Sequence, residues 1–376
     1  MTEIKHRKLF ETLKAKILEN AYGAGRAFPS EAQLSRTYGV SRTTIRKALG
    51  ELQHEGLIRS QRGRGTFVTR KGASRKIGLI VPSIRGSEFY PELVSELSKV
   101  VRENGYTLLF ADFSAGDPAK LADEVKAFAE RLVEENVAGV IYQPLEFLTD
   151  APAWSRRVLG FFDAANIPVT LMVSDIDFSP SRSRYDVVAV NNIAAGHRLA
   201  DHLVAVGARK IDFVIRPHYG PCYADRLEGI MSAKVSGGRG GCRFRVFLAE
   251  PDDLAALRRH LKRGRPDAFV CGCDALAGRF RQTLEKAGLR IPDDVLLAGF
   301  NDLHIARFMS PPLTTIHQPC AALAKTAFDT LLARIADPAR PTAEHFLDAP
   351  LVVRESTRRK SWTAGRAAPC RKGRKP

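Results

Sequence analysis

The pattern of apolar and polar residues changes near residue 77. Before that point, apolar residues recur at helical spacing, as at Ile4, Phe10, Leu13 and Ile17, with charged residues between them. After it, short apolar runs typical of buried strands alternate with amphipathic stretches typical of helices. The sequence therefore predicts a small helical segment followed by a larger body in which strands and helices alternate.

The helical segment contains signals for two short helices joined by a tight turn. Ser30 can cap a helix that runs to about Tyr38, and Gly39 suits the left-handed turn that ends it. Ser41 can then cap a second helix that ends at Gly56. Apolar side chains form one stripe along this second helix, and its polar face carries arginine, lysine and threonine.

Two short β-like runs, residues 57–59 and 66–68, follow the second helix and flank the glycine-rich turn QRGRG. Two helices, a tight turn and a hairpin in this order predict a winged helix-turn-helix. The second helix of that fold enters the major groove of DNA with its first residues toward the base edges. We expect DNA contacts from the start of this helix and from the glycine-rich turn: Ser41, Arg42, Thr43, Thr44, Arg46, Arg62, Gly63 and Arg64.

Residues 28–68, FPSEAQLSRTYGVSRTTIRKALGELQHEGLIRSQRGRGTFV, resemble the DNA-binding domain of the gluconate-operon-repressor (GntR) family. The resemblance implies that Arg42, Thr43, Arg46 and the turn residues 62–64 contact DNA. The family usually has an arginine directly after the glutamate of the PSE motif, and that arginine often contacts DNA. This chain has Ala32 there, so the resemblance implies one DNA contact fewer than usual.

The body shows the alternation expected of parallel sheets covered by helices on both faces. The predicted strands are residues 77–82, 106–112, 138–143, 167–173, 187–191, 211–215, 267–272 and 295–300. The predicted helices are residues 92–105, 119–136, 154–166, 196–207, 226–234, 253–263 and 275–287. A body of this length exceeds one sheet, which favours two lobes. Ligands of such sheets bind at the carboxyl ends of the strands, which here meet in the cleft between the lobes.

Residues 77–356 resemble the effector domain of the lactose/galactose-repressor (LacI/GalR) family. The resemblance is carried by IGLIVPSIRGSEFYPELVSELSKVVRENGYTLL, VNNIAAGHRLADHLVAVGARKIDFV, RLEGI and PDAFVCGCDALAGRFRQTLEKAGLRIPDDVLLAGFNDLHIARFMSPPLTTIHQP. It implies the periplasmic-binding-protein fold, so the predicted fold class is α/β, a winged helix-turn-helix followed by two lobes with parallel sheets. It also implies that polar residues near strand ends line an effector pocket: Ser83, Glu88, Phe89, Tyr90, Gln143, Arg226, Asp274, Asn301 and Gln318.

These residue types suit a ligand with many hydroxyl groups. Carboxylate and amide groups bond hydroxyls, arginine can bind two oxygens at once, and an aromatic ring can cover a sugar face. The family commonly has Asn-Asp where this chain has Cys273-Asp274, Asp-Asp where it has Asn301-Asp302, and Asp at the place of Asn191. Because fewer carboxylates bond fewer hydroxyls, a purine or another non-sugar ligand stays open. Asp274 could instead cap the helix that follows it.

The distribution of charge supports a nucleic-acid partner. The chain has 376 residues and a net charge of +17. Residues 1–76 hold 17 basic and 6 acidic side chains, and residues 357–376 hold 8 basic and none acidic. The remaining residues hold 33 basic and 35 acidic side chains, so two basic ends flank a nearly neutral body. A basic module on a neutral body is typical of proteins that bind nucleic acid, although a solvated charged surface has the same composition.

The composition and motifs also divide the chain and exclude several classes. We expect a DNA-binding domain over residues 1–70, a linker over 71–76, an effector-binding and dimerisation domain over 77–356, and a disordered basic tail over 357–376. The nucleotide-binding motif GxxxxGKS/T, the serine-hydrolase motif GxSxG and the zinc motif HExxH are absent, so we expect no enzyme. Cys271 and Cys273 form a Cys-x-Cys pair without a second pair at metal spacing, so we expect no metal and no cofactor.

No apolar run is long enough for a membrane span, and the charged N-terminus does not read as a signal peptide, so we expect a cytoplasmic protein without a membrane partner. The sequence predicts a homodimeric transcriptional regulator that binds double-stranded operator DNA and responds to a small-molecule effector, with repression of carbohydrate uptake or catabolism genes as the leading interpretation. One alternative is a regulator that senses a purine or another non-sugar ligand. A second is a solute-binding module whose basic ends serve as a scaffold.

Overall fold

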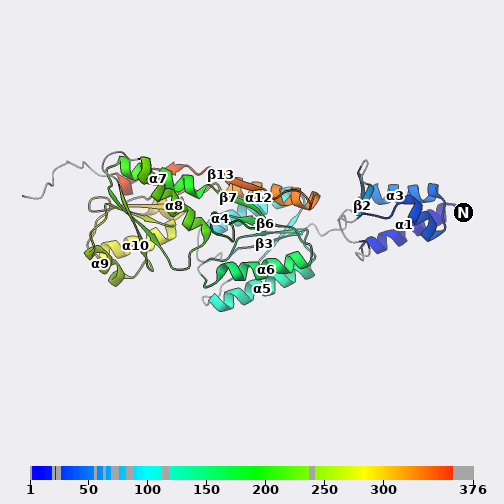
Figure 1. Ribbon diagram of the computed structural model, residues 1–376, viewed down its shortest axis with the longest axis horizontal. Helices are drawn as coiled ribbons and strands as arrows, with labels where there is room; N and C mark the ends of the chain where they lie inside the picture. Colours follow the sequence, from blue (N-terminus) through cyan, green and yellow to red (C-terminus); the bar gives the residue numbers. More distant parts are fainter. Residues whose placement is uncertain are drawn as a thin grey trace, which may run out of the picture.

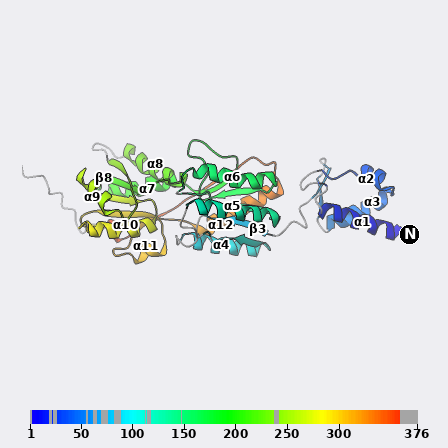
Figure 2. The same ribbon diagram turned by 90° about the horizontal axis from the view of Figure 1, so that it is seen from below.

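The computed structural model describes residues 2–18, 22, 27–54, 57–61, 65–68, 76–81, 89–111, 113, 118–146, 148–236 and 242–358. Several predictions fall outside these ranges: the DNA contacts Arg62, Gly63 and Arg64, the ligand contacts Ser83 and Glu88, linker residues 71–75 and tail residues 359–376. Figures 1 and 2 show the described elements as a helical head and two α/β lobes.

The head is a three-helix unit closed by a two-stranded antiparallel sheet. Its elements are α1 (Thr2–Leu18), α2 (Glu31–Tyr38), α3 (Arg42–His54), β1 (Ile58–Gln61) and β2 (Gly65–Val68). Helix α1 packs across α3, and Leu13, Ile45 and Leu52 are fully buried between them. The apolar stripe that the sequence predicts for the second helix therefore forms the core of the head.

Local capping sets the turn between α2 and α3. The Ser30 and Gln33 side chains each accept a hydrogen bond from the other residue's backbone N–H, a complete capping box. Gly39 ends α2 with φ of 62°, a left-handed conformation that glycine adopts without strain, and its N–H donates to the Ser35 carbonyl. The backbone N–H of Thr44 donates to Ser41 Oγ, which caps α3 as the sequence predicts.

The first lobe is built on six parallel strands in the order β13-β7-β6-β5-β3-β4. Its strands are β3 (Lys76–Ile80), β4 (Thr107–Phe110), β5 (Gly139–Tyr142), β6 (Val169–Met172), β7 (Asp186–Val190) and β13 (Glu344–Leu347). Its helices are α4 (Phe89–Glu103), α5 (Pro118–Glu134), α6 (Ala151–Ala164) and α12 (Cys320–Ala336). Leu79 and Ile80 point to opposite faces, where α4 and α12 cover one side and α5 and α6 the other (Figure 1).

The second lobe has a six-stranded sheet in the order β14-β12-β11-β10-β8-β9, parallel except for β14. Its strands are β8 (Lys210–Ile215), β9 (Arg243–Leu248), β10 (Ala268–Cys271), β11 (Leu296–Asn301), β12 (Thr314–His317) and β14 (Leu351–Val352). Its helices are α7 (Asn192–Ala205), α8 (Pro221–Ser236), α9 (Leu254–Lys262), α10 (Asp274–Lys286), α11 (His304–Phe308) and η1 (Glu355–Thr357). The predicted α/β class, with two lobes and parallel sheets, is confirmed.

The chain crosses between the lobes three times, after β7, after β12 and after β13. The sequence pattern missed the elements that make the last two crossings, among them α12, which follows the second-lobe strand β12 but packs against α4 of the first lobe. Strand β9 was also missed. Its buried residues are few because it lies at the sheet edge, so the apolar run that identifies inner strands is absent.

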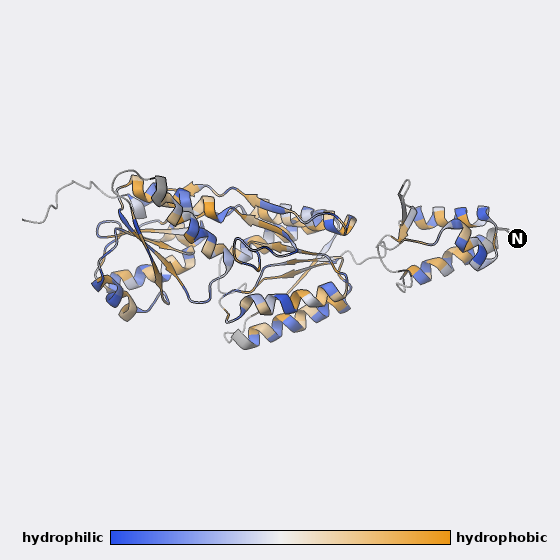
Figure 3. Ribbon diagram, in the orientation of Figure 1, coloured by the Kyte–Doolittle hydropathy of each residue, from blue (hydrophilic) through white to orange (hydrophobic). Residues whose placement is uncertain are grey.

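The helices of the lobes are amphipathic rather than apolar throughout. Figure 3 shows α5 and α6 with hydrophobic residues on one side and hydrophilic residues on the other. Their buried side chains, including Val125 and Leu159, belong to the cluster under the sheet. Within the part of the chain that the structure describes, no helix has the length and apolar character needed to cross a membrane.

Candidate DNA-binding face and inter-lobe cavity

The first turns of α3 present polar side chains to solvent. Ser41, Arg42, Thr43 and Arg46 are exposed, as the sequence predicts for residues that reach a DNA groove. The Arg46 side chain is 71% exposed, and its Nε lies 3.1–3.2 Å from both carboxylate oxygens of Glu31 on α2. This ion pair, which the sequence analysis missed, joins the Arg46 side chain on α3 to the first residue of α2.

Thr44 lies on the inner side of the same helix. The residue is 5% exposed, and its hydroxyl lies 2.9 Å from Ser41 Oγ. The two hydroxyls and the Thr44 backbone N–H form a closed cap at the start of α3. The predicted DNA contact by Thr44 is therefore corrected, because in this structure its side chain faces the head and not the solvent.

A cavity of about 310 Å³ lies between the two lobes. Four of the predicted ligand residues line it, Phe89 and Tyr90 from the first lobe and Arg226 and Asn301 from the second. The other lining residues, which the sequence analysis did not single out as ligand contacts, are Leu121, Glu146, Val173, Ile215, Arg216, Cys222, Tyr223, Pro251, Cys273, Ala275, Leu276 and Arg279. Residues far apart in the chain thus meet at one site because each follows or faces a strand end.

Arg226 is the most deeply held charge of this cavity wall. It is 3% exposed. Its Nε donates to the Asn192 side-chain oxygen at 2.9 Å, and Nη1 donates to the Gly272 carbonyl at 2.6 Å. Its Nη2 lies 3.5 Å from the Asn301 side-chain oxygen. All three acceptors are neutral, so hydrogen bonds fix the guanidinium but none of them balances its charge.

Helix packing and aromatic rings hold the Arg226 side chain in place. The rings of Tyr223 and Phe300 lie 5.2 and 4.7 Å from the guanidinium carbon. Two glycines let α7 and α8 approach closely. A Cβ atom at Gly196 would lie 2.2 Å from the Arg226 carbonyl oxygen, and one at Gly229 would lie 2.0 Å from the Ile193 carbonyl oxygen. The position of Arg226 therefore depends on a helix contact that only glycine permits.

Glu146 is the one carboxylate among the described residues that line this cavity, and it comes from the loop after β5. It is 8% exposed, and the Cys222 thiol donates to its Oε1 at 3.2 Å. Burial raises the pKa of Glu146 to about 7, against smaller lowering effects of the Cys222 hydrogen bond and the Arg226 charge. No motif marks this loop, so the sequence carried no signal for it.

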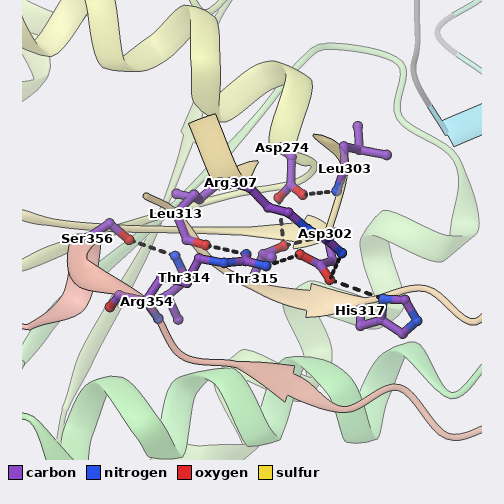
Figure 4. A network of polar contacts seen from close by, with 10 residues as sticks. All are labelled: Asp274, Asp302, Leu303, Arg307, Leu313, Thr314, Thr315, His317, Arg354 and Ser356. Carbon is purple, nitrogen blue, oxygen red and sulfur yellow. Dashed lines mark hydrogen bonds and ion pairs between the residues drawn. The ribbon is translucent and has the colours of Figure 1, made fainter. Parts of the chain in front are cut away.

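Asn301 and Asp302 turn away from strand β11 with unusual backbone angles, φ of 114° and 56°. The Asp302 carboxylate is held by Arg354 Nη2 at 2.5 Å and lies 3.2 Å from His317 Nδ1 (Figure 4). Its backbone N–H lies 3.4 Å from the Thr315 hydroxyl. A left-handed conformation of this kind costs energy for residues other than glycine. The contacts of Asp302 thus stabilise a turn that places Asn301 at the cavity.

Asp274 is buried next to the turn formed by Asn301 and Asp302 and is not among the residues that line the cavity. Its carboxylate accepts from the Thr315 hydroxyl at 2.7 Å and from the Leu303 backbone N–H at 2.9 Å (Figure 4). Burial raises its pKa to about 7. It is the first residue of α10 and its partners lie outside that helix, so it is not the helix cap, and its contact with a ligand stays a prediction. In this structure Asp274 joins the start of α10 to Leu303, which follows β11, and to Thr315 in β12.

Gln143 and Gln318 are also buried and are not among the residues lining the cavity of about 310 Å³. Gln143 Nε2 lies 3.4 Å from the Pro144 carbonyl, and its Oε1 has no partner among the described residues. The backbone N–H of Gln318 lies 3.3 Å from the Asn301 carbonyl, where the chain crosses to α12. Their contact with a ligand stays a prediction.

The Cys-x-Cys pair is split between two environments. Cys271 is buried inside the β10 strand, and Cys273 lines the cavity. Burial raises the pKa of both thiols, which keeps them protonated and weakens them as metal ligands. The described residues contain no group of three or more His, Cys, Asp or Glu side chains placed to hold a metal ion.

Comparisons with known proteins agree with this division. Residues 5–68 match the family described as "Bacterial regulatory proteins, gntR family", and residues 200–357 match a "Periplasmic binding protein-like domain". The chain thus joins a head that matches the gntR family to a body that matches a periplasmic-binding-protein-like domain, as the two resemblances found in the sequence imply.

Curated relatives match the chain at low identity. The HTH-type transcriptional repressor PurR of Glaesserella parasuis serovar 5 (strain SH0165) is 26% identical over 295 residues, 76% of this chain and 82% of that protein. The arabinose metabolism transcriptional repressor of Geobacillus stearothermophilus is 26% identical over 377 residues, 94% of this chain and 98% of that protein. The second match spans nearly the full length of both chains, so it includes the head and the body together.

A solved structure supports the fold of the body. A periplasmic binding protein/LacI transcriptional regulator from Alkaliphilus metalliredigens QYMF, complexed with D-xylulofuranose, is 23% identical and has a TM-score of 0.61. The match covers 76% of this chain and 100% of that chain. The fold, the exposed helix α3 and these matches define a DNA-binding transcriptional regulator. Within that class, the chain carries a head that matches the gntR family on a periplasmic-binding-protein-like body.

Proposed function

We propose that this protein represses genes by binding an operator through α3, and that a small molecule in the inter-lobe cavity changes its affinity for that operator. The effector of this proposal is a sugar or a close derivative, and the regulated genes serve its uptake or catabolism. The protein acts in the cytoplasm and catalyses no reaction. The observation that carries the proposal is the combination of an exposed arginine helix with a cavity lined from both lobes.

The cavity supports a mechanism for the switch. Phe89, Tyr90 and Glu146 belong to the first lobe, and Arg226 and Asn301 to the second. A ligand that contacts both walls binds the closed arrangement of the lobes more tightly than an open one and so shifts the population toward closure. Coupling of this kind between two sites amounts to about 1–3 kcal/mol. Three chain crossings join the lobes and supply the hinge.

A second copy of this chain is the proposed partner of the lobes. The edge strands β4 and β9 expose apolar side chains, among them Phe110, Val246 and Leu248, which are 45–55% exposed. Exposed edges with apolar side chains favour association with another chain. A twofold dimer places two heads on one duplex and predicts a pseudopalindromic operator.

Two alternatives remain distinct from this proposal. A regulator that senses a purine shares the architecture, and the relative named PurR is a reason to test purines. A solute-binding module that does not bind DNA has the same cavity but no use for an exposed Arg46. The identity of the ligand separates the purine sensor from the main proposal. DNA binding separates the solute-binding module from it.

The test is a DNase footprint of the full chain on DNA from upstream of its own gene, with and without a panel of pentoses, hexoses, sugar acids and nucleobases. The proposal predicts protection of two half-sites about one helical turn apart, and a change of protection with one ligand class. A purine response alone selects the first alternative. Absence of protection at every protein concentration contradicts the proposal and favours the second alternative.

A further inference from the structure

The arginines that line the cavity differ in how their charge is balanced. Arg216 Nε lies 3.1 Å from a carboxylate oxygen of Glu250, and Arg279 Nη2 lies 2.8 Å from one of Asp252. Among the described residues, no carboxylate forms an ion pair with Arg226, although it is the most buried of the three. Within the described part of the chain, the cavity wall therefore contains one buried guanidinium that has no carboxylate within ion-pair distance.

Arg226 also has hydrogen-bonding capacity left. A guanidinium carries five N–H groups. Three of them donate to Asn192, Gly272 and Asn301, the last at a long distance of 3.5 Å. One N–H group on each Nη nitrogen remains without an acceptor among the described residues. Two such groups can bind both oxygens of one carboxylate, the geometry in which arginine binds anions most strongly.

A buried charge without a counter-ion lowers stability, so its retention calls for a compensating interaction. A ligand that brings a negative charge supplies both the counter-ion and the missing acceptors. A neutral sugar supplies only acceptors. A phosphate monoester carries about two negative charges at neutral pH, one more than a single guanidinium balances, whereas a carboxylate carries one.

Glu146 is the feature of the cavity that opposes an anion. Its carboxyl group accepts from the Cys222 thiol, and its burial favours the protonated form. A protonated Glu146 does not repel a ligand carboxylate and offers an O–H donor to a ligand oxygen. Glu146 and Arg226 can therefore both face one bound anion when Glu146 is protonated.

The size of the cavity limits the ligand. Its volume of about 310 Å³ lies at the lower end of the range of about 300–1,000 Å³ that holds small-molecule ligands. This favours a single sugar unit over a disaccharide. The rings of Phe89, Tyr90 and Tyr223 line the same space and can cover one face of a small ring or chain.

We propose that the effector is a monosaccharide-sized sugar acid, an aldonate or a uronate, whose carboxylate binds Arg226. The inference rests on the proposed function, since it names the ligand class of the same cavity. It separates this chain from relatives named for the uncharged sugar arabinose and for purines.

The experiment is isothermal titration of the full chain with matched pairs in which a carboxylate replaces one CH2OH group: D-galacturonate and D-galactose, D-glucuronate and D-glucose, D-galactonate and D-galactitol. D-glucose 6-phosphate tests the phosphate source, and hypoxanthine tests a purine. At least one acid is expected to bind tenfold or more tightly than its neutral partner. Arg226→Gln is expected to remove that preference, and Arg290→Gln, at an exposed arginine paired with Asp294, is expected to keep it.

Equal binding of acid and neutral partners, tighter binding of the phosphate, or no binding of any acid at millimolar concentration overturns the inference. If Arg226→Gln does not fold, the acid-to-neutral ratio of the natural chain decides alone. The same preparations are tested for a shift of upstream DNA. A neutral ligand with an intact DNA shift contradicts the sugar acid but leaves the proposed function standing, whereas loss of the DNA shift contradicts the proposed function itself.

Discussion

Arg46 in the head and Arg226 in the body carry the same side chain into opposite environments. Arg46 is 71% exposed and pairs with Glu31 at the surface. Arg226 is 3% exposed and has only neutral hydrogen-bond partners. Water screens the charge of Arg46, so its carboxylate partner contributes little to stability and can be exchanged for a phosphate at small cost. Water does not screen the buried charge of Arg226, so the energy of that charge depends on which counter-ion it meets.

Arg354 completes the comparison, because its side chain is only 15% exposed, far less than that of Arg46, but it has a carboxylate partner as Arg46 does. Its Nη2 lies 2.5 Å from an Asp302 carboxylate oxygen, and its Nη1 donates to the Leu313 carbonyl (Figure 4). A buried arginine with a carboxylate partner serves the fold, and a buried arginine without one is available to a ligand. The difference teaches that burial alone does not identify a functional charge, and that the missing counter-ion does.

The largest expected effect concerns the stability of the ligand-free chain. Arg354→Met removes the main partner of the Asp302 carboxylate, which keeps Arg307 and His317 near it, and is expected to lower the free energy of unfolding by about 2–3 kcal/mol. Arg226→Met leaves only neutral acceptors, one of them on Asn301 at the cavity, and is expected to cost about 1–2 kcal/mol. Urea unfolding of both variants measures the two values. Equal losses would contradict the distinction between paired and unpaired buried arginines.

The second effect concerns DNA. Arg46→Ala is expected to weaken operator binding by about 1–3 kcal/mol, a factor of roughly 5 to 150, because it removes a contact from the reading helix. Electrophoretic mobility shifts at constant salt measure the change. Arg290→Ala serves as the control, since it removes a charge that lies in the body and pairs with Asp294. An Arg46 variant with unaltered affinity would remove α3 from the proposed interface.

The third effect concerns the helix contact that positions Arg226. Gly229→Ala places a Cβ atom 2.0 Å from the Ile193 carbonyl oxygen and is expected to destabilise the body by about 1–3 kcal/mol while weakening acid binding. Gly160→Ala in α6 is the matched control, because no atom lies within 4 Å of its Cβ position. The control is expected to be neutral or slightly stabilising. Thermal unfolding that ranks the two variants alike would refute the close contact of α7 with α8.

The smallest effect is a pH dependence of acid binding. Glu146, whose pKa burial raises to about 7, ionises as the pH rises through that value and then repels a ligand carboxylate. Around it, Cys222, Tyr90 and Tyr223 have pKa values raised well above their usual range and stay neutral. Affinity for a sugar acid is therefore expected to fall a few-fold between pH 6 and 8. Titrations across this range measure it, and Glu146→Gln is expected to flatten the profile; a flat profile in the natural chain would argue against Glu146 facing the ligand.

The sequence predicted the head in detail because its signals are local. Ser30, Gly39 and Ser41 act within three or four residues of their own positions, so capping and turn chemistry located the helices correctly. The sequence also singled out four residues that line the cavity. Phe89 and Tyr90 begin α4, Asn301 ends β11, and Arg226 lies within α8.

The rest depends on packing between distant segments. Glu146 reaches the cavity only because the loop after β5 meets the start of α8, where Cys222 donates to it. Asp274 has the residue type of a ligand contact, but the Leu303 backbone N–H and the Thr315 hydroxyl donate to its carboxylate in the protein interior. Neither outcome follows from spacing along the chain.

The measurement that tests the central claim most directly is the affinity of the full chain for two labelled duplexes, one from upstream of its own gene and one with the same base composition in scrambled order. Fluorescence anisotropy is recorded at increasing salt concentration. The account predicts that the upstream duplex binds about a thousandfold or more tightly, and that binding of both weakens steeply with salt. Equal affinities for the two duplexes, or affinities that salt does not change, would contradict a head that reads DNA through the arginines of α3.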